Sequence, residues 1–121
     1  MEETKILYQI FSRFTVALGV LNGLTSLEAR KLISKQFKKH PFEEEVKALI
    51  KKIDKDEHDS IEELLDKIIL VCDELGPSRE YVTLVNILEK IGNSFTEDRE
   101  QNEYKYTNSI IERFEKEVAF I

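Results

Sequence analysis

The chain has 121 residues, of which 41% are hydrophobic and 35% charged, with two prolines and four glycines. This composition is typical of one compact domain and excludes a disordered or collagen-like chain. The formal net charge of −6 is unevenly spread: residues 28–53 carry eight bases and four acids, whereas residues 54–121 carry eighteen acids and eight bases. The acidic second half disfavours general nucleic-acid binding but permits a local basic surface.

Cysteine usage and the N-terminal residues bear on the compartment. The single cysteine, Cys72, excludes an intramolecular disulfide and lies in an apolar run, where a buried structural thiol is expected. The first residues are acidic and amphipathic, unlike a signal peptide, and the apolar stretch 14–21 is too short to span a membrane. We expect a single domain, residues 1–121, in the cytoplasm and without a transmembrane segment.

Apolar residues recur every three or four positions near the N-terminus, which predicts a long, central first helix. Its main stripe is Leu7, Ile10, Phe11, Phe14, Ala17, Leu18 and Leu21, with Ile6, Val16 and Val20 on a second side. Because apolar residues occupy more than one side, self-association stays open. Asn22-Gly23 ends this helix, and Thr25 and Glu28 form a capping box that begins the next.

A second helix is predicted over about residues 26–39. Its expected core positions are Leu27, Leu32, Ile33 and Phe37. His40-Pro41 ends it, because a residue before proline avoids the α conformation, and Pro41 suits the first turn of a third helix. We expect His40 to contact the carbonyls of the preceding helix end. The apolar positions of the third helix are Phe42, Val46, Leu49, Ile50 and Ile53.

Three more helices follow in the second half of the chain. The apolar spacing of residues 61–75 predicts a fourth helix that ends at Gly76, and Ser78 begins a fifth that Gly92 ends. Thr96 begins the last and longest helix. The fifth helix is expected to bury Tyr81, Val82, Val85, Leu88 and Ile91, and the last to bury Tyr104, Thr107, Ile110, Ile111, Phe114, Val118 and Ile121.

The predicted fold class is therefore all-α, a compact bundle of about six helices. The first helix and the fourth to sixth supply most of the core. Gly23 and Gly76 lie 53 residues apart, each shortly before a serine that can begin a helix, which suggests two three-helix halves. Residue identity between the halves is weak, so shared cap chemistry is an alternative explanation.

Residues 54–65 look like a calcium loop but lack its ligands. A twelve-residue EF-hand loop needs glycine at position 6 and glutamate at position 12, where this chain has Asp59 and Leu65. A polar loop followed by a helix cap at Ser60 explains the same residues. His40 and His58 have no histidine or cysteine nearby, so a zinc site is not expected.

Motifs for catalysis are absent from the sequence. It contains neither a G-x-S-x-G elbow nor a glycine-rich phosphate loop, so we expect neither an enzyme nor a cofactor. Lys31, Lys35 and Lys38 share one face of the second helix, and such a row could hold phosphates. A solvated outer face is the ordinary explanation, since no aromatic residue interleaves these lysines to stack on bases.

Residues 16–33, VALGVLNGLTSLEARKLI, resemble the first helix-turn-helix of TerB-like domains, small all-helical modules named for tellurite resistance. In that family an apolar helix ends in an Asp-Gly turn, and a serine and a glutamate open the next helix. Residues 70–80 look like the second copy, although Asn22 stands where the family usually has aspartate. If the family's acidic turns bind a cation, the ligands that remain here are Glu28, Asp73 and Glu80.

We expect a non-catalytic interaction module that binds a protein partner, and the resemblance implies a stress-response or membrane-associated assembly. At least one of Tyr104 and Tyr106 should be exposed, and an exposed tyrosine can anchor a partner. Two alternatives remain. One is a divalent-cation-binding module that uses Glu28, Asp73 and Glu80, and the other is a small helical subunit of a nucleoprotein complex that uses Lys31, Lys35 and Lys38.

Overall fold

The structure is a computed structural model, and it describes residues 2–52, 60–95, 102–119 and 121. The helices are α1 (Glu2–Leu21), α2 (Ser26–Gln36), α3 (Glu43–Lys51), α4 (Ile61–Leu75), α5 (Glu80–Phe95) and α6 (Asn102–Ala119). No strand occurs in the described ranges, so the all-α prediction is confirmed. None of these helices pairs the length with the apolar character that crossing a bilayer requires.

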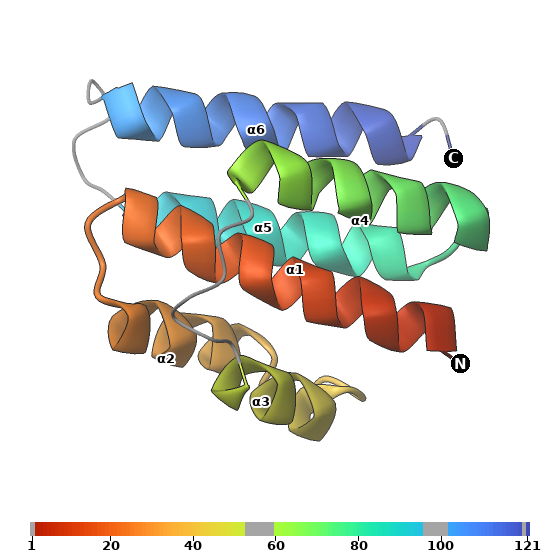
Figure 1. The fold of residues 1–121 in the computed structure, drawn as a ribbon, viewed down its shortest axis with the longest axis horizontal. Coiled ribbons are helices and arrows are strands. Elements are labelled where there is room, and N and C mark those ends of the chain that lie inside the picture. The colour runs from red at the N-terminus through yellow and green to blue at the C-terminus, as the bar shows by residue number, and fades with distance from the viewer. Residues whose placement is uncertain (1, 53–59, 96–101, 120) are drawn as a thin grey trace.

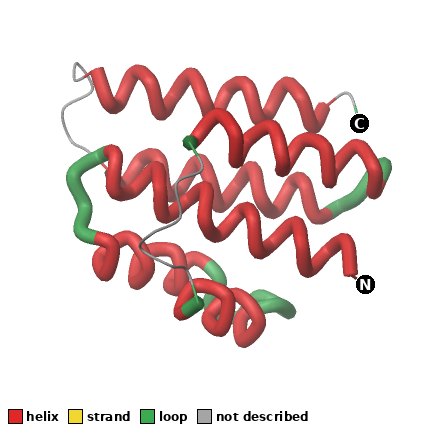
Figure 2. Tube along the Cα trace, viewed as in Figure 1, coloured by secondary structure: helices red, strands yellow, loops and turns green. Residues whose placement is uncertain are grey.

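The helices form two layers. α1, α4, α5 and α6 lie along the long axis of the molecule, and α2 and α3 lie beneath α1 (Figure 1). α1 runs antiparallel to α4, and α5 runs antiparallel to α6, so the two termini lie at the same end (Figure 1). Short loops join α1 to α2 at one end and α4 to α5 at the other (Figure 2). α1 packs against α2, α3, α4 and α5, which confirms its central place.

Aromatic side chains join the two layers around α1. The Phe11 ring lies 6.4 Å, between centroids, from Phe37 beyond the end of α2 and 6.4 Å from Phe114 of α6. All three rings are fully buried. The hydroxyls of Ser12 and Thr15, also buried on α1, donate to carbonyls one turn back, which lets polar residues enter the core.

The predicted cap at the start of α2 and the buried cysteine are confirmed. Thr25 Oγ1 accepts from the Glu28 N–H at 3.1 Å, and a Glu28 carboxylate oxygen accepts from the Thr25 N–H at 3.0 Å. Gly23 before this cap has a φ of 93°, a conformation that favours glycine. Cys72 is fully buried, and burial raises the pKa of its thiol to about 11, as befits a structural residue.

Two predicted core residues are in fact exposed: Leu27 is 61% and Val82 65% exposed. On α2 the inward position belongs to Ala29, because α1 and α2 approach so closely that a Cβ on Gly19 would lie 2.8 Å from the Ala29 Cβ. On α5 the fully buried Leu84 takes the core position. The other predicted core positions of these two segments are confirmed, because Ile33, Phe37, Tyr81, Leu88 and Ile91 are buried and Leu32 and Val85 pack against the core.

Some predicted helix boundaries are also wrong. α5 continues through Gly92 to Phe95; Gly92 marks a close approach to α6, since a Cβ there would lie 2.7 Å from the Ile111 Cδ1. α2 ends at Gln36, before Lys39, which has a φ of 69°. α3 begins at Glu43, after the proline.

The three-plus-three order of helices is present, but the halves differ in size. α2 and α3 have 11 and 9 residues, whereas α5 and α6 have 16 and 18. The longer pair spans the molecule beside α1 and α4, and the shorter pair covers one side of α1 (Figure 1).

Candidate functional site

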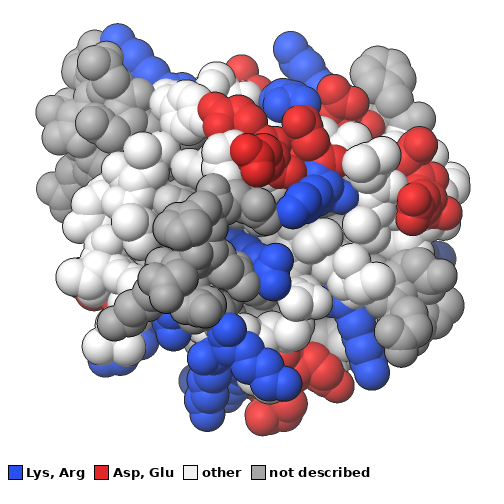
Figure 3. Space-filling model, viewed as in Figure 1, with Lys and Arg blue, Asp and Glu red and all other residues white. Residues whose placement is uncertain are grey.

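Charged side chains of both signs lie on each layer. On the face shown in Figure 3, lysines and arginines gather at the lower edge, over α2 and α3, with acidic side chains beside them, and a further group of acidic side chains lies above over α4 and α6. The predicted phosphate-binding lysines, Lys31, Lys35 and Lys38, are all exposed, and Lys38 lies in the turn after α2. Phe37 between them is fully buried, so this segment presents no ring on which a base could stack.

The three acidic residues proposed as cation ligands do not converge. Glu28 begins α2 at one end of the molecule, whereas the α4–α5 turn, with Asp73 before it and Glu80 after it, lies at the other end (Figure 1). Glu28 is engaged in its capping box, and the hydrogen bonds from Thr25 lower the pKa of its carboxyl. Among the described residues, no group of three or more His, Cys, Asp or Glu side chains is placed to hold a metal ion.

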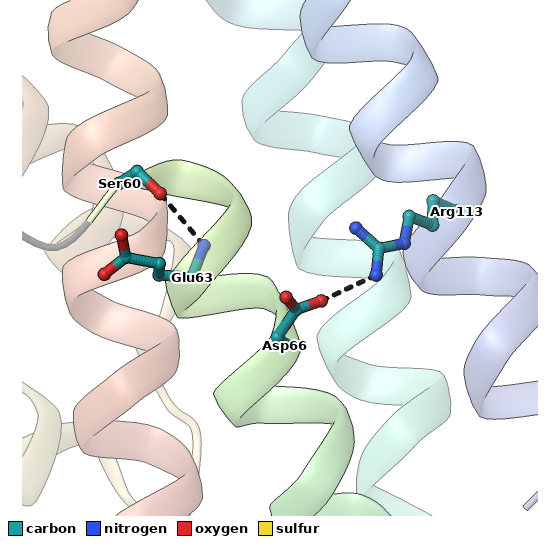
Figure 4. Close-up of polar contacts among 4 residues, drawn as sticks. All are labelled: Ser60, Glu63, Asp66 and Arg113. Atoms are coloured by element: carbon teal, nitrogen blue, oxygen red, sulfur yellow. Dashed lines mark hydrogen bonds and ion pairs between the residues drawn. The ribbon is translucent and has the colours of Figure 1, made fainter.

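The first half of the calcium-like segment, residues 54–59, lies outside the described residues, which resume at Ser60, so His58 lies outside them too. Ser60 Oγ accepts from the Glu63 N–H at 3.1 Å, as a helix N-cap does (Figure 4). Leu65, at the position where a calcium loop has its glutamate, is fully buried in the core. The described part of the segment therefore serves to begin α4.

Asn22, in the turn after α1, joins two helices. Its side-chain nitrogen donates to the Leu18 carbonyl at 2.7 Å and to Thr107 Oγ1, on α6, at 2.8 Å. A carboxylate could not donate either bond, because an ionised aspartate only accepts. The asparagine at this turn thus has a structural explanation of its own.

A polar cluster that the sequence did not reveal joins α1, the α2–α3 turn and α5. Tyr8 is 1% exposed, and its hydroxyl donates to the Glu80 carboxylate. His40 Nε2 lies 3.5 Å from that hydroxyl, and His40 Nδ1 accepts from the Phe42 N–H at 3.0 Å. Burial and then Glu80 raise the pKa of Tyr8, so its hydroxyl remains a donor.

This cluster corrects the expected role of His40. The ring accepts a backbone N–H at the start of α3 instead of contacting carbonyls at the end of α2. Because Nδ1 accepts, the neutral ring carries its proton on Nε2, facing Tyr8. The side chains hold three segments together at one end of the molecule, and their polar groups are occupied by one another.

A hollow of about 400 Å³ opens between the start of α5 and the end of α6. Its apolar lining is Pro77, Tyr81, Val82, Val85, Val118, Ala119 and Ile121. Val82 points away from the core because Leu84 and Leu88 of the same helix, both fully buried, fill it, whereas Val85 is partly buried against the core. The exposure of Val82 is thus a consequence of how α5 packs.

The hollow continues along the same two helices into a second one of about 300 Å³. The residues lining the second are Glu89, Gly92, Asn93, Thr107, Asn108, Ile111, Glu112 and Glu115. Glu89 and Glu115 line both hollows, so the two form one groove. We call it the α5–α6 groove, with an apolar half around Val82 and an acidic half around Glu89, Glu112 and Glu115.

The two carboxylates at the middle of the groove lie against each other. A hydrogen bond with Glu89 raises the pKa of the Glu115 carboxyl, and partial burial and the negative charges of Glu89 and Glu112 raise it further. The acidic half of the groove therefore brings side chains of like charge together.

The tyrosines proposed as exposed anchors are placed differently. Tyr106 is half-buried, and its hydroxyl donates to the Glu62 carboxylate of α4. The side chain of Tyr104 lies outside what the structure describes. Tyr106 is therefore a contact between helices. Among the described large apolar side chains, Val82 in the α5–α6 groove is the most exposed.

Comparison with known proteins adds no family to this picture: no family model, curated protein or solved structure matches the chain. The candidate functional site is therefore chosen on geometry, and it is the α5–α6 groove. A signal for it was present in the sequence. Val82, Val85 and Glu89 form a helical stripe separate from the one formed by Leu84, Leu88 and Ile91.

Proposed function

We propose that this chain is a non-catalytic interaction module that binds a protein partner through the apolar half of the α5–α6 groove. The observation that carries the proposal is Val82, 65% exposed in a hollow of about 400 Å³ lined mainly by apolar side chains. Concave apolar surface of this kind is typical of binding sites.

Two further observations support a binding role over a catalytic one. The polar cluster of Tyr8, His40 and Glu80 is engaged in internal hydrogen bonds, and Cys72 is buried with a raised pKa. Neither offers an activated nucleophile or a free base. The resemblance to TerB-like domains supports placing the module in a stress-response or membrane-associated assembly.

The test compares two equally exposed apolar residues. Val82 lies in the groove at 65% exposure, and Leu70, on α4, is 62% exposed and does not line it. The tagged chain and its Val82→Asp and Leu70→Asp variants would be cross-linked in native extract, and the recovered proteins quantified by mass spectrometry. Circular dichroism melting of both variants checks that neither has lost its fold.

At least one protein should be recovered with the unaltered chain and with Leu70→Asp, and lost at least tenfold with Val82→Asp. The proposal is wrong if all three chains recover the same proteins in the same amounts. It is also wrong if the purified chain turns over a substrate.

A further inference from the structure

The α5–α6 groove runs along most of α5. It follows α5 from Pro77, just before the helix, to Asn93 near its end. At a rise of 1.5 Å per residue, the 16 residues of α5 extend about 24 Å. A partner helix of about four turns would lie along the whole groove.

The two halves of the groove call for different side chains. The apolar half favours leucine, isoleucine or phenylalanine, since these remove Val82 and Val85 from water. The acidic half presents Glu89, Glu112 and Glu115 within one hollow. A lysine or arginine placed between Glu89 and Glu115 would relieve their mutual repulsion and form charge-assisted hydrogen bonds.

The same charges disfavour other occupants. An anionic membrane surface or a nucleic-acid backbone would be repelled by the acidic half. A second copy of this chain could offer α2, with exposed Leu27 beside Lys31 and Lys35. However, Leu27 is the one exposed apolar side chain of α2, so this helix would leave most of the apolar hollow unfilled.

We propose that the α5–α6 groove recognises an amphipathic helix of another protein, apolar in one half and rich in lysine or arginine in the other. This inference rests on the proposed function and specifies the partner. The apolar residues seat against Val82, Val85 and Val118, and the basic residues reach Glu89, Glu112 and Glu115. Charge complementarity selects the partner and sets its direction in the groove.

The experiment uses a displayed library of random peptides about sixteen residues long, selected on the full chain and depleted on Val82→Asp. Enriched peptides should carry apolar residues at three- and four-residue spacing followed or preceded by a basic half. Each enriched peptide would then be synthesised in two forms, with its basic residues retained or replaced by glutamate. The basic form should bind at least tenfold more tightly, with an affinity that falls as salt rises.

Two double variants locate the charge recognition. Glu89→Gln with Glu115→Gln should reduce the preference for the basic form about tenfold. Glu74→Gln with Glu117→Gln removes the same charge from exposed positions that do not line the groove, and should leave the preference nearly unchanged. Equal effects of the two double variants would show that the recognition is only of net charge.

Several outcomes overturn the inference and leave the proposed function standing. They are the enrichment of no peptide at all, the enrichment of acidic or uncharged peptides, and binding that survives Val82→Asp. In these cases a groove-dependent protein could still be recovered from extract. An oligomer of the chain that Val82→Asp dissociates would instead make a second copy the occupant.

Discussion

The last helix, α6, makes attractive polar contacts with α4, whereas its contact with α5 brings two carboxyl groups together. Against α4 the contacts are complementary: Tyr106 donates to Glu62, and Arg113 pairs with Asp66 at 2.6 Å (Figure 4). We call this pair of contacts the α4–α6 seam. Against α5, the groove places Glu115 beside Glu89, two groups of the same charge.

The pKa values of the carboxyls record this difference. In the α4–α6 seam, the hydrogen bond from Tyr106 lowers the pKa of Glu62, whereas in the groove Glu89 raises the pKa of Glu115. In the α4–α6 seam, the carboxylates of Glu62 and Asp66 each have a hydrogen-bond partner on α6. Under the proposed function, a bound segment would supply the groove with basic side chains and apolar cover. The helix α6 would then serve stability on one side and recognition on the other.

Phe114→Ala should have the largest effect on both sides of α6, because it removes the buried ring that holds this helix against the core. The ring is fully buried against Phe11, so we expect a loss of about 3–5 kcal/mol in the free energy of unfolding. Denaturant unfolding monitored by circular dichroism measures it. Val118→Ala, in the half-buried wall of the groove, should cost no more than about 1 kcal/mol. If Phe114→Ala and Val118→Ala lowered the free energy of unfolding equally, α6 would not bury the Phe114 side in preference to the Val118 side.

Gly92→Val would displace the side chain of Ile111, on α6, from its place against α5. A Cβ at this position lies 2.7 Å from the Ile111 Cδ1, so the larger side chain should cost about 1–3 kcal/mol through overpacking. The same unfolding measurement applies. Adding Ile111→Ala should recover part of the loss, since it removes the atom that is struck. Additive losses in the double variant would place the strain elsewhere.

Tyr106→Phe would test the α4–α6 seam alone, because it removes the hydroxyl that donates to Glu62. We expect a loss of about 1 kcal/mol in the free energy of unfolding, because the Glu62 carboxylate loses its donor. The pKa of Glu62, followed by NMR titration, should rise towards its ordinary value. The pKa of Glu115, on the other side of α6, should not move. Movement of both would indicate a shift of the whole helix.

Local signals in the sequence were sufficient for most of the fold. The Thr25–Glu28 capping box, the Ser60 cap and the positive φ of Gly23 each depend on residues within one turn, and all three could be predicted. Leu27 and Gly92 were misread because their places depend on how closely α1 approaches α2 and α5 approaches α6. The distance between two packed helices depends on residues far apart in the sequence, so the apolar period of one helix does not predict it.

The candidate site was harder to predict for the same reason. Glu89 and Glu115 lie 26 residues apart in sequence and meet only because α5 and α6 pack antiparallel. Val82 was assigned to the core, since an apolar residue on a helix is more often buried than displayed. The separate stripe of Val82, Val85 and Glu89 is visible in the sequence, but only the packing shows which stripe faces the solvent.

The smallest expected effect is a difference in the sign of pH dependence between the two sides of α6. The pKa of Glu62 is lowered from an ordinary value of 4.5, so its stabilising contribution is present above that value and is lost as the pH falls. The pKa of Glu115 is raised, so its contribution is present below pH 4.5 and is lost as the pH rises through the folded-state pKa. At neutral pH, Glu62→Gln should therefore be less stable than the unaltered chain, and Glu115→Gln more stable by less than about 1 kcal/mol.

Both differences should shrink in acid, because protonation makes each glutamic acid resemble the glutamine that replaces it. Unfolding free energies measured from pH 7 to pH 3 would show the two variants converging on the unaltered chain from opposite sides. If Glu115→Gln were the less stable chain at pH 7, the Glu89–Glu115 contact would be favourable when ionised. The groove would then have no uncompensated charge for a basic partner to satisfy.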